Sequence, residues 1–545
     1  MTKITKLFVL IVLVYQYQVS AQTNNTKQLS KEELKTWYHK DFDTDTIPGV
    51  SLEKAYKEIL ANKKGQEIIV AVLDTKMDIY HEDLKDQIWI NTDEIANNGI
   101  DDDKNGYIDD VHGWDFLSNT EGEFVKYEHL ESTRIVRKYN SVFKDKKLAD
   151  IADNDKEAYA LYTKAFEKWE NDVIKNKETL KKIKQTREAI IQGKAFLDSV
   201  YPKKEYKITE LDSLIKVHEN DSIITNALSE FKVGIQYNLT EERLNKYINS
   251  YQNRTQTMLN LDFDERTIPG DNADDINDNN YGSPIVYGDV PFQHATVVAG
   301  TLGAIRSNNV GMKGFSDNIK IMPVVMVASG DERDKDVALA IQYAVDNGAK
   351  VINMSWGKTL SQNEKWVNDA IKYAADKDVL LITAGGNENT NNDQVKYYLN
   401  DYNSDEKEFV DNFIVVGAST WDIQSLRASF SNYGKKHVDV FAPGVDMYTT
   451  EYGTDKYTSS RGTSLASPVV SGIAGLIRSY YPNLSAKEVK QILLESGISY
   501  DVTVAMKQED GSVKQVPFSE LSKSGKVVNA YNALVLAEKM SKNKK

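Results

Sequence analysis

The sequence predicts an α/β protein with a doubly wound parallel sheet, interrupted by an inserted helical hairpin or small helical domain. Short apolar runs alternate with amphipathic, helix-length stretches from Ile68 onward, which is typical of a parallel sheet covered on both faces. Residues 125–261 are instead rich in Lys and Glu and nearly free of Gly and Pro, which indicates the helical insertion. With 41% hydrophobic residues, the 545-residue chain can fill a sizeable core.

Six short apolar runs are predicted to be the buried strands of the sheet. They cover residues 68–73, 319–327, 351–354, 379–383, 413–418 and 438–441. Helix-length patterns over 337–345 and 366–375 lie between them. Ligands of doubly wound sheets bind at the carboxyl ends of the strands, so we expect the functional side chains there.

The insertion carries an apolar seam at alternating steps of three and four residues, which predicts one long helix. Two later stretches, 208–217 and 239–248, are expected to pack back on that helix. Packing within the insertion is the favoured interpretation of the seam, and a partner-binding face is the alternative. The seam consists of Tyr162, Phe166, Trp169, Val173, Leu180, Ile183 and Ile190.

The first residues have the pattern of a secretory signal. Lys3 and Lys6 precede a short apolar run over 7–14, and small residues end at Ala21, so residues 1–21 are predicted to be removed and the protein to be secreted or periplasmic. A buried N-terminal strand is the alternative. The remaining boundaries are an N-terminal extension or short prosegment (22–60), the α/β domain (61–124 and 262–535), the insertion (125–261) and a charged tail (536–545).

Composition excludes several classes of function. A net charge of −14 disfavours nucleic acid and anionic membranes as partners, and no stretch after the signal is long enough to span a bilayer. The chain has no cysteine, which excludes disulfides, thiolate metal sites and a cysteine nucleophile. We expect a monomer.

Four short motifs place reactive side chains next to predicted strands or helix starts. Asp74 ends the strand 68–73, and His294 precedes a run of small and β-branched residues suited to a closely packed helix. Ser464 follows Gly462, which permits a tight turn, and lies at the predicted start of a helix where the dipole favours an oxyanion. Asn387 follows the strand 379–383, and its amide could complete an oxyanion hole.

In this order, the motifs of Asp74, His294, Asn387 and Ser464 resemble the subtilisin-like serine protease family, the subtilases. The resemblance covers about 26–118 and 262–535 and implies a secreted endopeptidase that cleaves protein or peptide substrates. In such a mechanism the serine attacks to form an acyl-enzyme, the histidine acts as base and then acid, and the aspartate orients it. The asparagine amide and the serine N–H hold the oxyanion.

The resemblance also implies the residues that bind substrate. An edge segment pairs with the substrate backbone, and a glycine strip together with Trp356 borders the first specificity pocket. The predicted substrate-binding residues are Ser355, Trp356 and Gly357 of the edge, and Ala384, Gly385 and Gly386 of the strip.

Two positions depart from the family pattern, which commonly has glycine where this chain has Lys76 and Ala295. Neither departure removes a reacting group, but either could change the approach of the backbone at the site. The alternative function is therefore a catalytically inactive secreted scaffold that binds a partner through the helical insertion. The four intact motifs argue against it, because a binding scaffold needs none of them.

An acidic loop over 98–110 is predicted to bind calcium as a structural cofactor. Its oxygen-bearing residues alternate as at the start of an EF-hand loop, but His112 stands where that loop has Glu, so it is not an EF-hand. A solvated acidic turn is the alternative, and a second acidic run over 271–278 is interpreted as a plain loop. The predicted ligands are Asp101, Asp103, Asn105, Tyr107 by its carbonyl, and Asp109 or Asp110.

Overall fold

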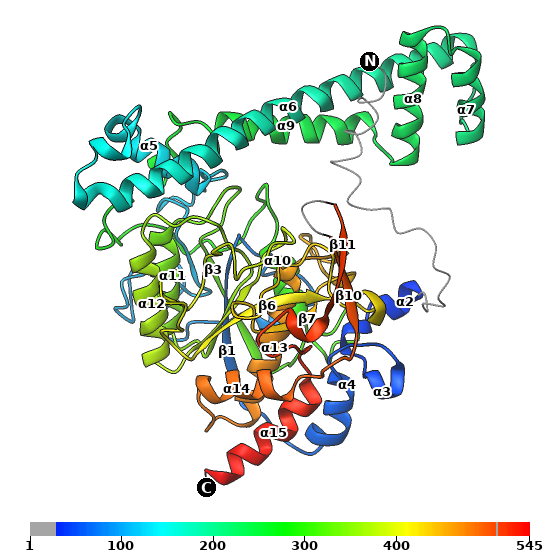
Figure 1. Ribbon diagram of the computed structural model, residues 1–545. Coiled ribbons are helices and arrows are strands. Elements are labelled where there is room, and N and C mark those ends of the chain that lie inside the picture. Colours follow the sequence, from blue (N-terminus) through cyan, green and yellow to red (C-terminus); the bar gives the residue numbers. More distant parts are fainter. Residues whose placement is uncertain (1–28, 508–510, 545) are drawn as a thin grey trace. The chain divides into compact units, whose positions relative to one another are not determined.

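The computed structural model describes residues 29–507 and 511–544, which form two compact units (Figure 1). One unit, the helical unit, comprises Ser132–Phe263, and the other, the sheet unit, comprises residues 29–131 and 264–544. The predicted signal, residues 1–21, lies outside the described residues. Within the described part of the chain, no helix combines the length and apolarity needed to cross a membrane.

The sheet unit is built on a seven-stranded sheet in the order β2-β3-β1-β4-β5-β6-β7. Every neighbouring pair is parallel, which confirms the predicted fold class. The short β2 was not expected from the sequence, because two residues carry no periodicity. The strands are β1 (Ile68–Asp74), β2 (Trp114–Asp115), β3 (Ile319–Val325), β4 (Val351–Met354), β5 (Leu380–Ala384), β6 (Phe413–Ser419) and β7 (Val440–Pro443).

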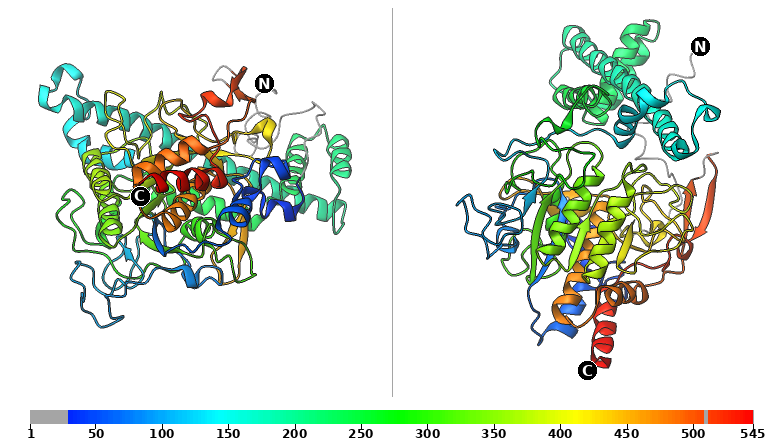
Figure 2. Two further views of the ribbon diagram at one scale, coloured as in Figure 1. Left: turned by 90° about the horizontal axis from the view of Figure 1, so that it is seen from below. Right: turned by 90° about the vertical axis from the view of Figure 1, so that its left-hand side faces the viewer.

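Helices cover both faces of this sheet, as alternating side chains of β1 show. Val70 and Val72 join a core cluster with residues of α10 (Ala295–Gly303) and α13 (Thr463–Tyr480). Ala71 and Leu73 point the other way, into a cluster with α11 (Asp334–Asp346) and α12 (Glu364–Asp376). The latter two helices face the viewer in the right-hand view of Figure 2. Both faces of the strand are therefore buried, which explains its uninterrupted apolar sequence.

Two hairpins and two C-terminal helices complete the core of the sheet unit. The hairpins pair β8 (Met447–Thr450) with β9 (Tyr457–Ser460) and β10 (Thr503–Lys507) with β11 (Val513–Pro517). Helices α14 (Ala486–Ser496) and α15 (Ala530–Asn543) pack against each other and against α13. Thus α15 runs across the boundary at 535 predicted for a charged tail, and Ala537 in its third turn is fully buried.

The segment ahead of β1 is packed into the sheet unit. It forms α2 (Lys31–Leu34), α3 (Phe42–Asp45), α4 (Leu52–Ala55) and a π-turn over Tyr56–Leu60. Trp37 and Tyr38 are buried, and their side chains donate hydrogen bonds to the carbonyls of Val445 (3.1 Å) and Tyr448 (3.2 Å). This segment therefore contributes to the core beside β8.

The second unit is entirely helical in its regular structure. It contains most of α5 (Glu131–Phe143), then α6 (Lys156–Val200), α7 (Ile208–Val217), α8 (Ser222–Gln236) and α9 (Glu241–Gln256). The 45-residue α6 is drawn as the longest ribbon of Figure 1. Ile190 of α6 forms a cluster with Leu239 and Leu244, and Leu197 forms another with Leu211 and Leu228. The distal half of α6 is therefore covered by α7, α8 and α9.

Candidate active site

Asp74 and His294 meet at the carboxyl end of β1. Asp74 is the last residue of the strand and fully buried, and His294 is the N-cap residue of α10 with 17% of its side chain exposed. The imidazole Nδ1 lies 2.8 Å from Asp74 Oδ2 and 3.0 Å from Oδ1. Because a carboxylate can only accept, Nδ1 carries the proton and Nε2 is left as the free basic nitrogen.

The negative charge of Asp74 increases the basicity of the His294 imidazole. Burial lowers the pKa of His294, but the negative charge of Asp74 and its hydrogen bond more than offset this, so the pKa is raised above its ordinary value. The ring of Phe292 stacks on the imidazole with centroids 5.2 Å apart. The histidine is thus held from two sides and is a stronger base than in water.

Thr75 is a site residue that sequence reasoning missed. Its Oγ1 accepts hydrogen bonds from the backbone N–H groups of His294 (3.1 Å) and Ala295 (3.0 Å). These are donors at the start of α10 that have no partner within the helix. Thr75 therefore caps the helix that carries the histidine, and its own N–H donates to Asp74 Oδ1 at 2.7 Å. Because Thr75 is 219 residues before His294 in sequence, no local sequence pattern shows that it caps this helix.

Ser464 lies in the first turn of α13, directly after a glycine turn. Gly462 has φ of 150°, and a Cβ there would lie 2.8 Å from Ser464 Oγ, so a side chain at 462 would obstruct the hydroxyl. The Ser464 carbonyl accepts a hydrogen bond from Ser355 Oγ at 2.9 Å. Within the described residues, neither Ser464 Oγ nor His294 Nε2 makes a hydrogen bond within 3.5 Å.

The side chain of Asn387 is oriented by the residue before Ser464. Asn387 Oδ1 accepts from the N–H (2.9 Å) and the hydroxyl (3.0 Å) of Thr463. Since a backbone N–H can only donate, the carbonyl end of the amide must face Thr463, and Nδ2 is directed elsewhere. A Cβ built on Gly462 would lie 3.8 Å from that Nδ2 and 2.8 Å from Ser464 Oγ. The amide donor and the serine hydroxyl thus border the same small space beside Gly462.

The predicted substrate edge lies at the end of β4, with its side chains turned inward. Ser355 Oγ makes hydrogen bonds with the amide of Asn353, the hydroxyl of Ser467 and the carbonyl of Ser464, so it joins β4 to α13. The indole of Trp356 donates to the Leu73 carbonyl at 2.6 Å and only 8% of the residue is exposed. The Trp356 side chain is therefore packed against β1.

The glycines of the predicted edge and of the predicted strip are closely approached by other groups. A Cβ on Gly357 would lie 2.4 Å from the ring of Tyr397 and 2.6 Å from the Tyr398 carbonyl. Gly385 donates its N–H to the Val416 carbonyl, next to the buried Ala384. The Gly386 N–H donates to Thr463 Oγ1 at 3.2 Å, which joins this strip to the turn before Ser464.

The two departures from the family pattern have structural explanations. Lys76 forms an ion pair with Asp115 at 3.2 Å, with 5% and 0% of the two side chains exposed. Burial raises the pKa of the Asp115 carboxyl, and the charge of Lys76 opposes this. Ala295 is fully buried in the cluster that joins α10 to the sheet. Lys76 is therefore the counter-ion of a buried carboxylate, and Ala295 fills core space.

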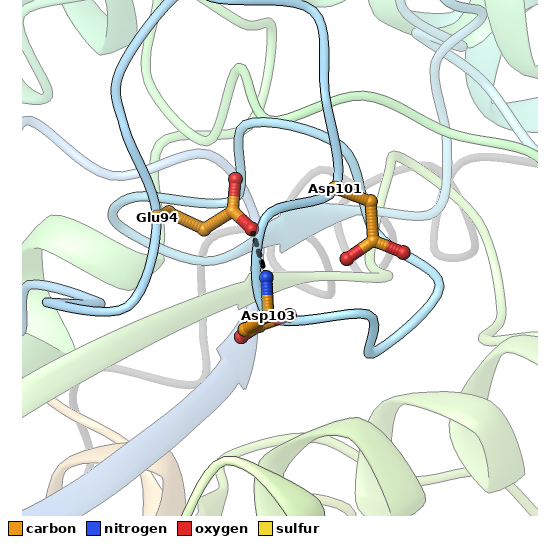
Figure 3. Close-up of side chains that lie close together, drawn as sticks. All are labelled: Glu94, Asp101 and Asp103. Atoms are coloured by element: carbon orange, nitrogen blue, oxygen red, sulfur yellow. Dashed lines mark hydrogen bonds between the residues drawn. The ribbon is translucent and has the colours of Figure 1, made fainter.

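Three carboxylates converge in the acidic loop and could hold a cation (Figure 3). Oxygen atoms of Glu94, Asp101 and Asp103 all lie within 4.8 Å of one another. Glu94 was missed in the sequence, because it lies outside the alternating pattern. Its Oε1 accepts from the N–H groups of Asp102 and Asp103, and the latter contact is the dashed line of Figure 3. Carboxylates this close together suit a hard divalent cation.

The other predicted ligands have different partners. Asp109 accepts from the N–H groups of Asn98 and Gly99. Asp110 is buried and accepts from the hydroxyl of Tyr343 at 2.6 Å, and burial raises its pKa to about 6. Asn105 donates its amide to both Asp103 and Asp110, and the ring of Tyr107 packs against Trp114, Phe116 and Tyr343. The structure thus groups Asp101 and Asp103 with Glu94, and directs Asp109 and Asp110 to other contacts.

A doubly wound sheet, an aspartate–histidine pair at one strand end and a serine in the first turn of a buried helix are features that α/β serine hydrolases share. The model of the Subtilase family matches residues 65–518, and the chain belongs to this family. The predicted resemblance is confirmed at this level.

Similar proteins cover the chain to different extents. Subtilisin DY from Bacillus licheniformis is 38% identical over 211 residues, which is 37% of this chain and 68% of that protein. Thermitase from Thermoactinomyces vulgaris is 36% identical over 188 residues, 34% of this chain and 61% of thermitase. A solved protease structure from Pseudoalteromonas arctica aligns with 93% of this chain and 97% of that chain, at 18% identity and a TM-score of 0.44.

Proposed function

We propose that the chain is a serine endopeptidase that hydrolyses peptide bonds through an acyl-enzyme on Ser464. The observation that carries the proposal is the fixed tautomer of His294, whose Nδ1–H is held by the buried Asp74 while Nε2 stays free. A serine hydroxyl becomes nucleophilic only when such a base takes its proton. Membership of the Subtilase family supports the same reaction.

In the first half of the reaction, the backbone of a protein or peptide substrate pairs with the edge 355–357. The Ser464 hydroxyl attacks the carbonyl while His294 Nε2 takes its proton, and Asp74 stabilises the imidazolium that results. Asn387 Nδ2 and the Ser464 N–H donate to the developing oxyanion. The base and the hydroxyl are not yet hydrogen-bonded, and such contacts commonly tighten only when substrate binds.

In the second half, His294 returns its proton to the leaving amine, which departs and leaves the acyl-enzyme. A water molecule then gives a proton to Nε2 and attacks the ester, and the same donors hold the second oxyanion. The intermediate collapses, the C–O bond to Ser464 breaks, and Nε2 returns the proton to Ser464 Oγ as the carboxylic acid product leaves. We propose that the enzyme acts as a monomer after export, as a secreted or periplasmic protein. The charged and apolar pattern of residues 1–21 supports export.

Covalent labelling by a fluorophosphonate tests the proposal, because the reagent reacts rapidly only with an activated serine. We expect labelling on the peptide that contains Ser464 and cleavage of unfolded casein. Ser464→Ala and His294→Ala should each abolish labelling. Asn387→Ala should keep it but turn over about 100- to 1000-fold more slowly, the usual cost of one oxyanion donor. A wild-type protein that is folded, unlabelled and inert would instead support the inactive scaffold.

Calcium as a structural cofactor is proposed for the carboxylates of Glu94, Asp101 and Asp103. A bound ion would hold the loop over 98–110 against the segment that carries Glu94. Because a ligand that binds only the folded state stabilises it by mass action, excess calcium should raise the melting temperature relative to a chelator. The variant Asp101→Asn should lose that difference. Identical midpoints with calcium and chelator in the wild type would refute the site.

A further inference from the structure

The apolar seam of α6 is covered at both ends and open in between. At one end, the ring of Tyr162 lies 5.8 Å from that of Phe143 in α5. At the other, Ile183 and Ile190 pack in a cluster with residues of α8 and α9. The side chains between these stretches, Trp169, Val173 and Leu180, are only half-buried.

This open stretch forms one wall of a hollow of about 510 Å³. The chain that follows α9 forms the opposite wall, with Leu259 and Leu261. The two walls are joined by a hydrogen bond of 3.0 Å from the indole N–H of Trp169 to the Leu259 carbonyl. A second hydrogen bond, from Asn176 Nδ2 to Thr255 Oγ1 at 2.7 Å, joins α6 to the end of α9. The hollow is thus preformed and large enough for a bulky side chain. Five of its ten lining residues are apolar, and polar or charged groups come from Asn176, Lys177, Thr255, Asn260 and Asp262.

A row of ammonium groups continues from the hollow along α6. Lys177 and Leu180 line the hollow and also border a neighbouring one of about 280 Å³, which Lys181, Lys184 and Glu188 line as well. Within the described residues, no carboxylate oxygen lies within 4.0 Å of the ammonium groups of Lys177, Lys181 or Lys184. All three lysines are exposed.

The charge of this stretch is opposite to that of the chain. Residues 175–187 contain six basic side chains and one acidic one, whereas the whole chain has a net charge of −14. Unpaired like charges on neighbouring turns of a helix repel one another, which destabilises the helix unless an anionic partner binds. The row therefore has an electrostatic reason to bind a partner of the opposite sign.

We propose that the hollow and the lysine row form an exosite that binds an acidic segment of a polypeptide, with one bulky apolar side chain in the hollow. The apolar side chain removes Trp169, Val173 and Leu180 from water, and the flanking carboxylates pair with Lys177, Lys181 and Lys184. Such a segment would belong to a protein substrate, so the proposal deepens the proposed function and rests on it.

The shape of the surface favours a polypeptide over other anions. An anionic membrane binds a continuous apolar helix face that can enter the lipid, whereas here the apolar residues line a concave hollow. A nucleic acid would use the lysines but not the hollow, and the net charge of the chain repels it. A peptide segment uses both features at once.

Fluorescence anisotropy of a labelled peptide in which Phe-Leu is flanked by Asp and Glu tests the exosite. The full-length Ser464→Ala protein is used so that the peptide is not cleaved. We expect saturable binding that weakens with salt. Binding should weaken strongly when Asp and Glu are replaced by Asn and Gln, or when Phe-Leu is replaced by Gly-Gly. The double variant Lys177→Glu/Lys184→Glu should bind the acidic peptide about tenfold more weakly or worse, because two attractive contacts become repulsive.

The matched control is Lys164→Glu/Lys175→Glu, which makes the same change of charge on the same helix. These two lysines lie about half a turn away from Lys177 and Lys184 around α6, so the control should bind within about twofold of the unmodified protein. Circular dichroism establishes that both double variants are folded. Equal weakening in both, equal binding of acidic and neutral peptides, or binding of phosphatidylglycerol vesicles in place of the peptide would overturn the exosite.

The exosite and the protease can fail separately. If the wild-type protein is not labelled by a fluorophosphonate but the acidic peptide binds selectively, the proposed function fails and the binding surface stands. If Ser464 is labelled and the peptide shows none of the expected selectivity, the exosite fails and the protease stands.

Discussion

Replacing Thr75 by Val removes one hydroxyl and tests how His294 is positioned. The substitution keeps the shape of a side chain that is 2% exposed. The N–H groups of His294 and Ala295 then lose their shared acceptor at the start of α10. Loss of a helix N-cap costs about 0.5–2 kcal/mol. Because these donors lie at a buried helix end, we expect the upper part of that range, about 2 kcal/mol of unfolding free energy.

The catalytic effect should exceed what the loss of stability explains. His294 is the N-cap residue of α10, so freeing the start of that helix moves the imidazole relative to Ser464. A displacement of about 1 Å at a reacting group can lower the rate about 100-fold. We therefore expect kcat on a short peptide, and the rate of fluorophosphonate labelling, to fall by roughly 10- to 100-fold at temperatures where the protein is folded.

Thr133→Val is the matched control in the helical unit. The Thr133 hydroxyl is also buried and donates to the Met258 carbonyl at 2.7 Å, so the same atoms are lost far from the triad in sequence. Urea unfolding should show a loss of about 1 kcal/mol, the typical value of one hydrogen bond, with an unchanged labelling rate. If Thr75→Val is labelled as fast as Thr133→Val, then Thr75 does not position the histidine and the reasoning is wrong.

Three further predictions concern the pH dependence, a buried ion pair and the helical unit. Activity needs neutral His294, and the pKa of this residue is raised. The acid limb of the pH profile of kcat/KM should therefore have its half-point above the ordinary histidine pKa of about 6.5. A half-point below that value would contradict the Asp74 contact. Lys76→Met should cost about 3–5 kcal/mol at neutral pH by leaving Asp115 buried and unpaired. Without Lys76 the pKa of the buried Asp115 should rise further in the folded state, so the loss should grow as pH rises through the already raised pKa of Asp115 in the wild type. In urea titrations it should shrink at lower pH, where Asp115 is protonated in both proteins, and a pH-independent loss would exclude an electrostatic cause. Replacing residues 132–263 with a short flexible linker should leave a folded protein that still cleaves small peptides. The reason is that His129 and Glu265, beside the two junctions, already contact each other at 2.8 Å. An insoluble product would show that the helical unit is needed for folding.

Most of the sheet could be predicted because its signals are local. A strand buried on both faces needs an unbroken apolar run, and the run 68–73 corresponds to β1 (Ile68–Asp74). The run 319–327 was predicted two residues too long at its end, because β3 stops at Val325 while the apolar sequence continues. An apolar run indicates that its side chains are buried, and side chains can remain buried beyond the last hydrogen-bonded residue of a strand.

The four motif residues could be predicted from short local patterns, but their partners could not. Asp74, His294, Asn387 and Ser464 each lie in a segment whose small residues and glycines have local meaning. Thr75 acts on an N–H pair more than two hundred residues away, and nothing near it in sequence signals this. Its role emerges only when the end of β1 meets the start of α10.

The sequence by itself determined the fold class, the family and the four motif residues, because strand burial, turn glycines and helix starts depend on neighbouring residues. Only the tertiary structure decided which side chains form ion pairs and which could bind one cation together. It paired Lys76 with Asp115 across 39 positions, and it grouped Glu94 with Asp101 and Asp103 while directing Asp110 to Tyr343. Electrostatic and hydrogen-bonded contacts act over a few ångströms in space, so their partners become known only when the chain is folded.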